Sequence, residues 1–283
     1  MKHWKDVVHH TAFRYLDHTE KNIFHGRAYT ALTSFAVDDV LALSAAGADT
    51  EAAVRLWVHS DTVVLGIPDT RLPHLKEGIR LVSERGYHAI VRNSGGLAVP
   101  LDAGVLNLSL VLPSVRGISI HDCYDAMVGF IQHVLRDLTD GIEAYEIVGS
   151  YCPGDYDLSI SGRKFAGISQ RRVKNGAAIQ IYLDVNGRGQ ERAELIRDFY
   201  EAARKGEATS FDYPDIEPSV MASLSELLGM ELTVDDLKSR VWEAINAVSD
   251  RMRTSDFSDD EWEQFTKRYA QMVKRNENVA AMQ

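Results

Sequence analysis

The stretch from Gly149 to Gly176 contains a thiol and an ammonium group at a short separation in sequence. Cys152 lies in a Ser-Tyr-Cys-Pro-Gly-Asp segment, and Lys164 follows in the same stretch. Proline and glycine break strands, so the segment predicts a loop, and loops commonly carry reactive groups. A thiolate attacks a carbonyl carbon when a neighbouring cation or base favours its deprotonated form. We therefore predict that Cys152 is a nucleophile and that Lys164 is its local cation.

Residue chemistry alone leaves other interpretations open. A free cysteine is often buried as a small hydrophobe, and a single hairpin lysine is more often solvated than catalytic. Cys123 lies in the first turn of a helical pattern, which indicates a structural role. His88 and His121 are alternative bases, but His88 lies in an apolar strand and His121 at the start of a helix.

The residues around Lys164 predict a β-hairpin. A short alternating strand from Tyr156 to Ile160 precedes Ser-Gly-Arg, and a second apolar segment runs from Phe165 to Ser169. Two strands separated by about three residues that include glycine are typical of a hairpin. With the thiol before its first strand and the ammonium just past its turn, such a hairpin could bring the two groups together.

A second candidate site is the segment Arg92-Asn93-Ser94-Gly95-Gly96, directly after a predicted strand. Its backbone N–H groups could bind an anion or a developing oxyanion, although two adjacent glycines also suit an ordinary hairpin turn. The segment matches neither Gly-x-x-x-x-Gly-Lys-Ser/Thr nor a Gly-x-Gly-x-x-Gly that opens a helix, so no phosphate-loop nucleotide site is indicated. No His or Cys cluster has the spacing of metal ligands, and we expect neither a metal nor a cofactor.

The composition is that of an ordinary globular chain that can bury a full core, with 283 residues of which 45% are hydrophobic. The formal charge of -10 argues against nucleic acid as a partner. No run approaches roughly 18 consecutive apolar residues and the first residues lack a signal-type apolar segment, so we expect a cytoplasmic protein that does not bind membranes. Two cysteines are too few for a disulfide framework, which leaves Cys152 free to react.

Hydrophobic periodicity predicts an α/β (α+β) fold in which helices pack against a mixed sheet through about Gly189. Strands are expected at Ala53–His59 and Thr62–Ile67, which together look like a hairpin, and at Tyr87–Arg92, Leu97–Leu101, Val105–Leu112, Glu143–Val148 and Ala177–Val185. Helices are expected at Ala31–Ala48, ending before Gly47, at His74–Arg85 and at His121–Leu138. Further helices are expected at Glu191–Lys205, Val220–Leu228, Thr233–Val248 with Thr233 as N-cap, and Asp259–Arg275, before a frayed tail.

Two segments taken together resemble the lipoate–protein ligase and lipoyl/octanoyltransferase superfamily. The first, Arg92 to Pro113, is similar to Arg-x-Ser-Gly-Gly-x-Ala-Val followed by Gly-x-Leu-Asn-x-Ser. The second, Asp157 to Arg172, is similar to a pattern that ends in Gly-x-Lys-hydrophobic-x-Gly-x-Ser/Ala-Gln. Order and separation agree, and the resemblance covers about residues 30 to 250.

The resemblance implies a fold and a set of site residues. The fold is a biotin/lipoate-protein-ligase-like mixed sheet with packed helices, in one catalytic domain over residues 1–283 with a helical C-terminal extension from about residue 191. Gly95 and Gly96 would line an acyl tunnel, and Lys164 would contact the acyl carbonyl. The other substrate-binding residues implied by the motifs are Arg92, Ser94, Asn107, Asp157 and Gly167.

The position of the cysteine separates the branches of this family. ATP-dependent lipoate ligases use the lysine without a catalytic cysteine, and the acyl-carrier-protein-dependent octanoyltransferase of many Gram-negative bacteria has its cysteine after the lysine motif. Here Cys152 precedes Lys164, and no cysteine follows Gln170. This order resembles the amidotransferase branch of Gram-positive lipoate assembly, although a sister branch that takes octanoate from acyl carrier protein shares it.

For the amidotransferase branch, the resemblance implies octanoyl transfer through a cysteine thioester. Cys152 would attack the octanoyl-lysine amide of the glycine-cleavage H protein, and a lysine on the lipoyl domain of a 2-oxoacid dehydrogenase E2 subunit would then accept the acyl chain. Neither step needs ATP or a metal. Because lipoyl domains are usually acidic, we expect a basic docking rim formed by Arg163, Arg171, Arg172 and Lys174. The alternatives are transfer from acyl carrier protein, ATP-dependent ligation, and a non-catalytic protein that binds lipoyl domains or lipoate.

Overall fold

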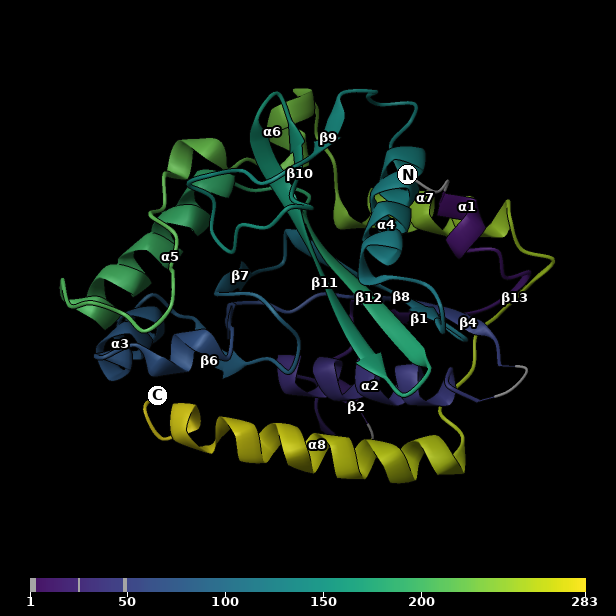
Figure 1. Ribbon diagram of the computed structural model, residues 1–283, viewed down its shortest axis with the longest axis horizontal. Helices are drawn as coiled ribbons and strands as arrows, with labels where there is room; N and C mark the ends of the chain where they lie inside the picture. The colour runs from purple at the N-terminus through teal and green to yellow at the C-terminus, as the bar shows by residue number, and fades with distance from the viewer. Residues whose placement is uncertain (1–3, 25, 48–49) are drawn as a thin grey trace.

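The computed structural model describes residues 4–24, 26–47 and 50–283, and a mixed β-sheet runs through its centre (Figure 1). The strands of this sheet are β1 (Ala12–His18), β4 (Ala52–Trp57), β8 (Val105–Leu112), β9 (Ile142–Ala144), β10 (Leu158–Ile160), β11 (Arg163–Val173), β12 (Gly176–Asp184) and β13 (Arg251–Arg253). Their order across the sheet is β13-β1-β4-β8-β12-β11-β10-β9. β1 pairs in parallel with β4 and β13, and the other neighbours pair antiparallel. The predicted mixed sheet is confirmed, and β1 and β13 lie just outside the expected core of about residues 30–250.

A smaller sheet covers part of one face of the main sheet. It consists of β5 (Thr62–Leu65), β6 (His88–Val91) and β7 (Val99–Leu101), in the order β6-β5-β7. The predicted hairpin between Ala53–His59 and Thr62–Ile67 is therefore wrong, although both segments contain strands. β4 pairs with β1 and β8, whereas β5 pairs with β6 and β7. Both strands are buried along their whole length, so their apolar patterns do not distinguish one pairing partner from another.

Helices cover both faces of the main sheet and confirm the predicted α/β class. Their bounds are α1 (Trp4–Val7), α2 (Ala31–Ser44), α3 (Leu75–Glu84), α4 (Ile120–Val134), α5 (Gly189–Arg204), α6 (Leu224–Leu228), α7 (Val234–Asn246) and α8 (Asp259–Ala280). Two 3₁₀ turns, Pro68–Arg71 and Pro218–Val220, and a small hairpin of β2 (Ile23–Phe24) and β3 (Arg27–Ala28) complete the elements. One hydrophobic core joins α2, α3, α5, α8 and the small sheet to one face, and a second joins α1, α4 and α7 to the other.

Two helix ends bear on the limits predicted from the sequence. Thr233 caps α7 as predicted: its Oγ1 accepts a hydrogen bond from the backbone N–H of Asp236 at 3.1 Å. α2 ends at Ser44, and the predicted helix limit Ala48 lies outside the described residues.

The prediction of a frayed C-terminal tail is wrong, because α8 continues to Ala280 alongside α2 (Figure 1). The buried side chain of Asn276 makes hydrogen bonds to both backbone groups of Val91, to the N–H at 2.6 Å and the C=O at 3.1 Å. Gln283 binds the backbone of Ala89 in the same way. The tail thus extends the hydrogen bonding of β6.

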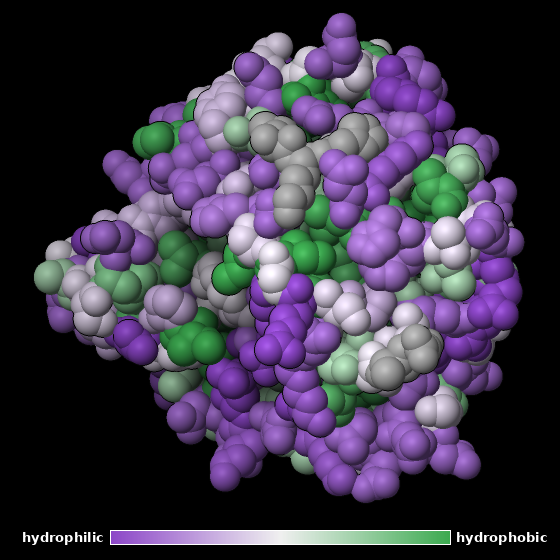
Figure 2. Space-filling model, turned by 45° about the vertical axis from the view of Figure 1, so that its right-hand side comes forward, coloured by the Kyte–Doolittle hydropathy of each residue, from purple (hydrophilic) through white to green (hydrophobic). Residues whose placement is uncertain are grey.

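Hydrophilic residues predominate on the part of the surface that Figure 2 shows. On the face drawn in Figure 2, exposed hydrophobic residues form separate small patches among hydrophilic ones. Among the residues the structure describes, no helix is both long enough and apolar enough to cross a membrane.

Candidate active site

A cavity of about 290 Å³ lies between the small sheet and the face of the main sheet that α2 covers. One wall is a row of paired residues, Trp57 on β4, Asn107 on β8, Tyr182 on β12 and Gly167 on β11. Residues directly opposite each other in neighbouring strands point to the same face, so this row presents one continuous surface to the cavity. Val64, Val99 and Leu101 add apolar side chains from the small sheet. The cavity is therefore suited to an apolar chain.

Cys152 lies at this cavity, in the loop between β9 and β10, as the sequence predicts. Its φ is 46°, a left-handed conformation that residues other than glycine rarely adopt. The sulfur accepts hydrogen bonds from Nη2 of Arg92 at 3.3 Å and from the backbone N–H of Leu97 at 3.1 Å. Two donors, a guanidinium and a backbone N–H, are thus aimed at one sulfur. The cation beside the sulfur is thus Arg92, where the sequence suggested Lys164.

The Ser94-Gly95-Gly96 segment lies directly beside Cys152. Gly96 has a φ of 105°, and a Cβ at this position would overlap Nη2 of Arg92 and lie 2.9 Å from the sulfur of Cys152. Only glycine fits there. Gly95 also lines the cavity, but a Cβ at this position would have no neighbouring atom within 4 Å. Ser94 is buried, and its hydroxyl has no hydrogen-bond partner in the described part of the chain.

Lys164 lies beneath the loop that carries Cys152, and it is fully buried. Its Nζ lies 2.8 Å from Oδ1 of Asp157 and donates hydrogen bonds to the carbonyl oxygens of Tyr151 and Cys152, each at 2.9 Å, and to the hydroxyl of Ser150 at 3.1 Å. The interpretation of Lys164 as a solvated hairpin residue is therefore wrong. Its ammonium reaches the main chain of Cys152, and in this structure it fixes the loop.

Asp157 is the counter-ion in this buried pair and also lines the cavity. Burial raises the pKa of its carboxyl, and the ammonium of Lys164 opposes that shift. Its second oxygen accepts a hydrogen bond from the backbone N–H of Ile147 at 3.3 Å. Asp157 therefore ties the segment before Cys152 to the hairpin after it.

The predicted hairpin is confirmed and explains how these residues meet. β10 and β11 pair antiparallel across a two-residue turn, Ser161-Gly162, with φ values of 52° and 75°. Positive φ at both central positions is characteristic of a type I′ turn. The turn returns Lys164 alongside Ser159, so that its side chain reaches the preceding loop.

The other basic and sulfur-containing candidates lie in different surroundings. His121 lines the cavity, and its Nδ1 lies 3.2 Å from the hydroxyl of Tyr156. His88 is exposed at the start of β6, where it contacts Gln283. Cys123 is fully buried in α4, in agreement with its predicted structural role.

The expected basic rim is divided. Arg171 extends to Asp39 of α2, where the two side chains lie 2.8 Å apart, whereas Arg172 donates to the carbonyl of Ile118, before α4, at 2.9 Å. Adjacent residues of a strand point to opposite faces, so these arginines cannot share one surface. Lys174 lies in the β11–β12 turn, far along the strand from Arg163.

Sequence reasoning missed the residues that shape the floor of the cavity. Trp57 packs edge-to-face on Phe35 of α2, and its Nε1 donates to the hydroxyl of Ser109 at 3.3 Å. That hydroxyl and the amide of Gln180 both donate to Asp38 of α2, at 2.7 and 2.6 Å. Alternation in β4 and β12 places Trp57 and Gln180 on one face, but only the pairing of the strands brings them together.

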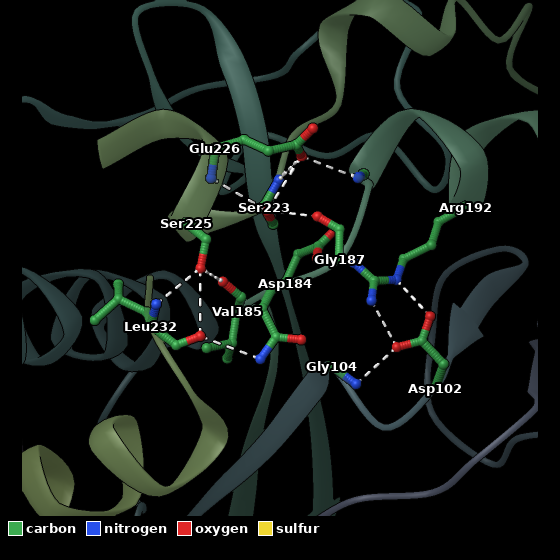
Figure 3. Close-up of polar contacts among 12 residues, drawn as sticks. Asp102, Gly104, Asp184, Val185, Gly187, Arg192, Ser223, Ser225, Glu226 and Leu232 are labelled. Atoms are coloured by element: carbon green, nitrogen blue, oxygen red, sulfur yellow. Dashed lines mark hydrogen bonds and ion pairs between the residues drawn. The ribbon is translucent and has the colours of Figure 1, made fainter. Parts of the chain in front are cut away.

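A polar network fixes the beginning of α5 (Figure 3). Arg192 of α5 binds both carboxylate oxygens of Asp102, at 2.7 and 2.6 Å, and also contacts Asp184 at the end of β12. Glu226 accepts hydrogen bonds from the N–H groups of Gly189 and Ser223, at 3.1 and 2.8 Å. α5 is thereby anchored to the main sheet.

No group of three or more His, Cys, Asp and Glu side chains that could hold a metal ion is found in residues 4–24, 26–47 and 50–283. The polar groups at the cavity include a thiol, a guanidinium, an imidazole, hydroxyls, carboxylates and amides. Together with the apolar wall, they suit a carbonyl group attached to a hydrocarbon chain.

Comparison with known proteins agrees with this description. The family model of the lipoyl protein ligase A/B catalytic domain matches residues 30–246. A protein of Oceanobacillus iheyensis named octanoyl-[GcvH]:protein N-octanoyltransferase is 58% identical over 278 residues, which cover 98% of this chain and 100% of the relative. A protein of Geobacillus kaustophilus with the same name is 51% identical, covering 90% of each chain.

Solved structures support the fold. A lipoate-protein ligase A bound with ATP superposes with a TM-score of 0.68 at 14% identity, over 92% of this chain and 94% of the other. A bipartite lipoate protein ligase from Thermoplasma acidophilum superposes with a TM-score of 0.65 at 17% identity, over 92% and 93%. The predicted biotin/lipoate-protein-ligase-like architecture is confirmed.

Proposed function

The chain belongs to the family of the lipoyl protein ligase A/B catalytic domain, and from this premise we propose that it moves an octanoyl group between lysine side chains of two carrier proteins. The donor is the octanoylated H protein of the glycine-cleavage system, as in the names of its relatives. The acceptor we propose is the lipoyl domain of 2-oxoacid dehydrogenase E2 subunits, and we propose the cytoplasm as the compartment, where thiols remain reduced.

The observation that carries this proposal is the sulfur of Cys152, held at an apolar cavity by Arg92 and the N–H of Leu97. The thiolate attacks the carbonyl carbon of the octanoyl-lysine amide. The new C–S bond forms as the C–N bond breaks, and the lysine of the H protein leaves as an amine after taking up a proton. The octanoyl chain then occupies the cavity between Val99, Leu101 and Tyr182.

In the second step, the neutral amine of the acceptor lysine attacks the thioester carbonyl. A C–N bond forms, the C–S bond breaks, the amine loses its proton and the thiolate of Cys152 is restored. An amide is broken in the first step and an amide is made in the second, so the overall reaction is close to balanced in bond energy. Lys164 and Asp157 keep the loop of Cys152 in place through both steps.

Mass spectrometry of the intact protein tests the proposal. Incubation with octanoylated H protein should add one octanoyl group to the protein and to Cys123→Ala, the matched control for the second cysteine, but not to Cys152→Ala. Subsequent addition of a lipoyl domain should remove the adduct and octanoylate the domain. Absence of the adduct from the unaltered protein, or transfer by Cys152→Ala at the normal rate, would contradict the mechanism.

The same assay separates the alternatives. Octanoyl-acyl carrier protein as the better donor would place the chain in the sister branch. Transfer that depends on ATP and releases AMP would identify a ligase. A Cys152 that reacts with neither donor nor iodoacetamide near neutral pH would favour a non-catalytic binding protein.

A further inference from the structure

Asp69 and Tyr200 form a buried pair directly behind the Gly95–Ala98 segment. Asp69 lies in the 3₁₀ turn Pro68–Arg71 and is fully buried, and Tyr200 on α5 is 2% exposed. The tyrosine hydroxyl donates a hydrogen bond to Oδ1 of Asp69 at 2.8 Å. Neither Asp69 nor Tyr200 belongs to the described residues that line the cavity. The pair is therefore separated from the acyl chain by the segment it touches.

Both members of the pair bind the backbone around this segment. The other oxygen of Asp69 accepts the N–H of Gly66 at 2.7 Å, and the Tyr200 hydroxyl accepts the N–H of Ala98 at 3.4 Å. Gly66 lies against Gly96 so closely that a Cβ on Gly66 would overlap the Gly96 carbonyl oxygen. Residues 96–98 are thus held on the side away from Cys152 by two contacts, the hydrogen bond from Ala98 to Tyr200 and the packing of Gly66 against Gly96.

The front side of the same segment holds the sulfur. The N–H of Leu97 donates to Cys152, and the carbonyl of Leu97 accepts from Nη2 of Arg92 at 2.6 Å. The same guanidinium nitrogen reaches the sulfur. A shift of residues 96–98 therefore moves both donors that contact Cys152.

We propose that Asp69 and Tyr200 are positioning residues that hold the Leu97 N–H and the Arg92 guanidinium in line with the sulfur of Cys152. This inference rests on the proposed cysteine chemistry. The polar network at the start of α5 supports it, because Arg192 fixes the helix that carries Tyr200 (Figure 3). Burial raises the pKa of Asp69 to about 6, so enclosing this carboxyl has a cost that its hydrogen bonds to Tyr200 and Gly66 partly offset.

Two variants test the proposal, Tyr200→Phe and Asp69→Asn. Tyr29→Phe is the matched control, because Tyr29 is also buried and does not line the cavity, while its hydroxyl accepts a hydrogen bond from Arg55 and lies 2.7 Å from that of Ser34. The measurements are the rate of Cys152 alkylation by iodoacetamide as a function of pH, and the rate of thioester formation as a function of the concentration of octanoylated H protein.

For Tyr200→Phe we expect thioester formation about tenfold slower, an unchanged KM for the H protein, and an alkylation profile displaced to higher pH. Tyr29→Phe should lose thermal stability without either change. A Tyr200→Phe protein that is alkylated along the unaltered profile and forms the thioester at the unaltered rate would overturn the inference. The alkylation profile needs no acyl donor, so this result is distinct from failure of octanoyl transfer, which would show in the unaltered protein.

Discussion

The ammonium of Lys164 lies 2.8 Å from the carboxylate of Asp157, and both side chains are buried beneath the loop that carries Cys152. Two further contacts of the ammonium are main-chain carbonyls of that loop, including the carbonyl of Cys152 itself. The lysine therefore acts on the nucleophile by fixing its backbone. Cys152 has a positive φ, and such a conformation persists only where its surroundings enforce it.

Removing one member of this pair should destabilise the protein strongly. Lys164→Met leaves a buried carboxylate without its counter-ion, and we expect the free energy of unfolding in urea to fall by about 3–5 kcal/mol. Lys267→Met is the control, because Lys267 forms an exposed pair with Glu263 on α8, and loss of this exposed pair should leave the free energy of unfolding almost unchanged. In the double variant Lys164→Met with Asp157→Leu, stability should partly return while thioester formation does not. Equal losses for Lys164→Met and Lys267→Met would contradict this account.

The two adjacent glycines should respond differently to alanine. Gly96→Ala places a Cβ onto the guanidinium of Arg92 and beside the sulfur of Cys152, at a φ of 105°. We expect thioester formation to fall by roughly a hundredfold, since displacement of a reacting group by about 1 Å has effects of this size. Gly95→Ala meets open space and should retain far more activity. Single-turnover kinetics measure the rate of thioester formation in both variants. Equal losses in Gly95→Ala and Gly96→Ala would contradict the prediction.

Local features of the site could be predicted from the sequence. The loop of Cys152 follows from its proline and glycine, and the hairpin follows from alternation around Ser161-Gly162. The contact of Arg92 with Cys152 joins residues 60 positions apart, and no local pattern indicates it. The burial of Lys164 was missed because its counter-ion, Asp157, lies just before β10, and the two side chains meet only once β10 and β11 have paired.

Long-range pairing accounts for the errors in the fold. β4 and β5 have similar apolar patterns. Their pairing with strands from distant parts of the chain places β4 in the main sheet and β5 in the small sheet. The polar sequence at the end of α8 predicts fraying, but the side chain of Asn276 forms hydrogen bonds with the backbone N–H and C=O of Val91. Such partners exist only once the small sheet has formed.

Acid should destabilise the fold through its buried histidines. Burial and the charge of Arg55 lower the pKa of His59 to about 3 and that of His18 to about 2. Below the ordinary value of 6.5 the unfolded chain binds these protons and the folded protein does not, so the free energy of unfolding falls as the pH drops from 6.5 towards 3. His59→Gln should reduce the loss between pH 7 and pH 5 by about 2 kcal/mol. Urea unfolding at pH 7 and pH 5 measures the free energy of unfolding at each pH. An equal loss of this free energy in His59→Gln and in the unaltered protein would contradict the prediction.

Trp57 should limit the length of the acyl chain. Tyr151, next to Cys152, stacks on Tyr182 with ring centroids 5.9 Å apart, so the thiol lies near the β12 part of the row. The row spans three strand spacings from Gly167 to Trp57, about 14 Å, and an extended octanoyl chain measures about 9 Å. An acyl chain that starts at Cys152 and runs along this row approaches the indole, which Phe35 and Ser109 hold in place.

Trp57→Ala should therefore favour longer chains. We expect the ratio of kcat/KM for dodecanoylated over octanoylated H protein to rise by about tenfold or more, because each added methylene in an apolar pocket is worth about 1–3 kcal/mol. Trp242→Ala is the control, since Trp242 is 39% exposed on α7 and packs against Tyr15 on the other face of the sheet. The ratio is insensitive to the amount of folded protein. If Trp57→Ala lowers activity on all chain lengths equally, the end of the cavity lies elsewhere.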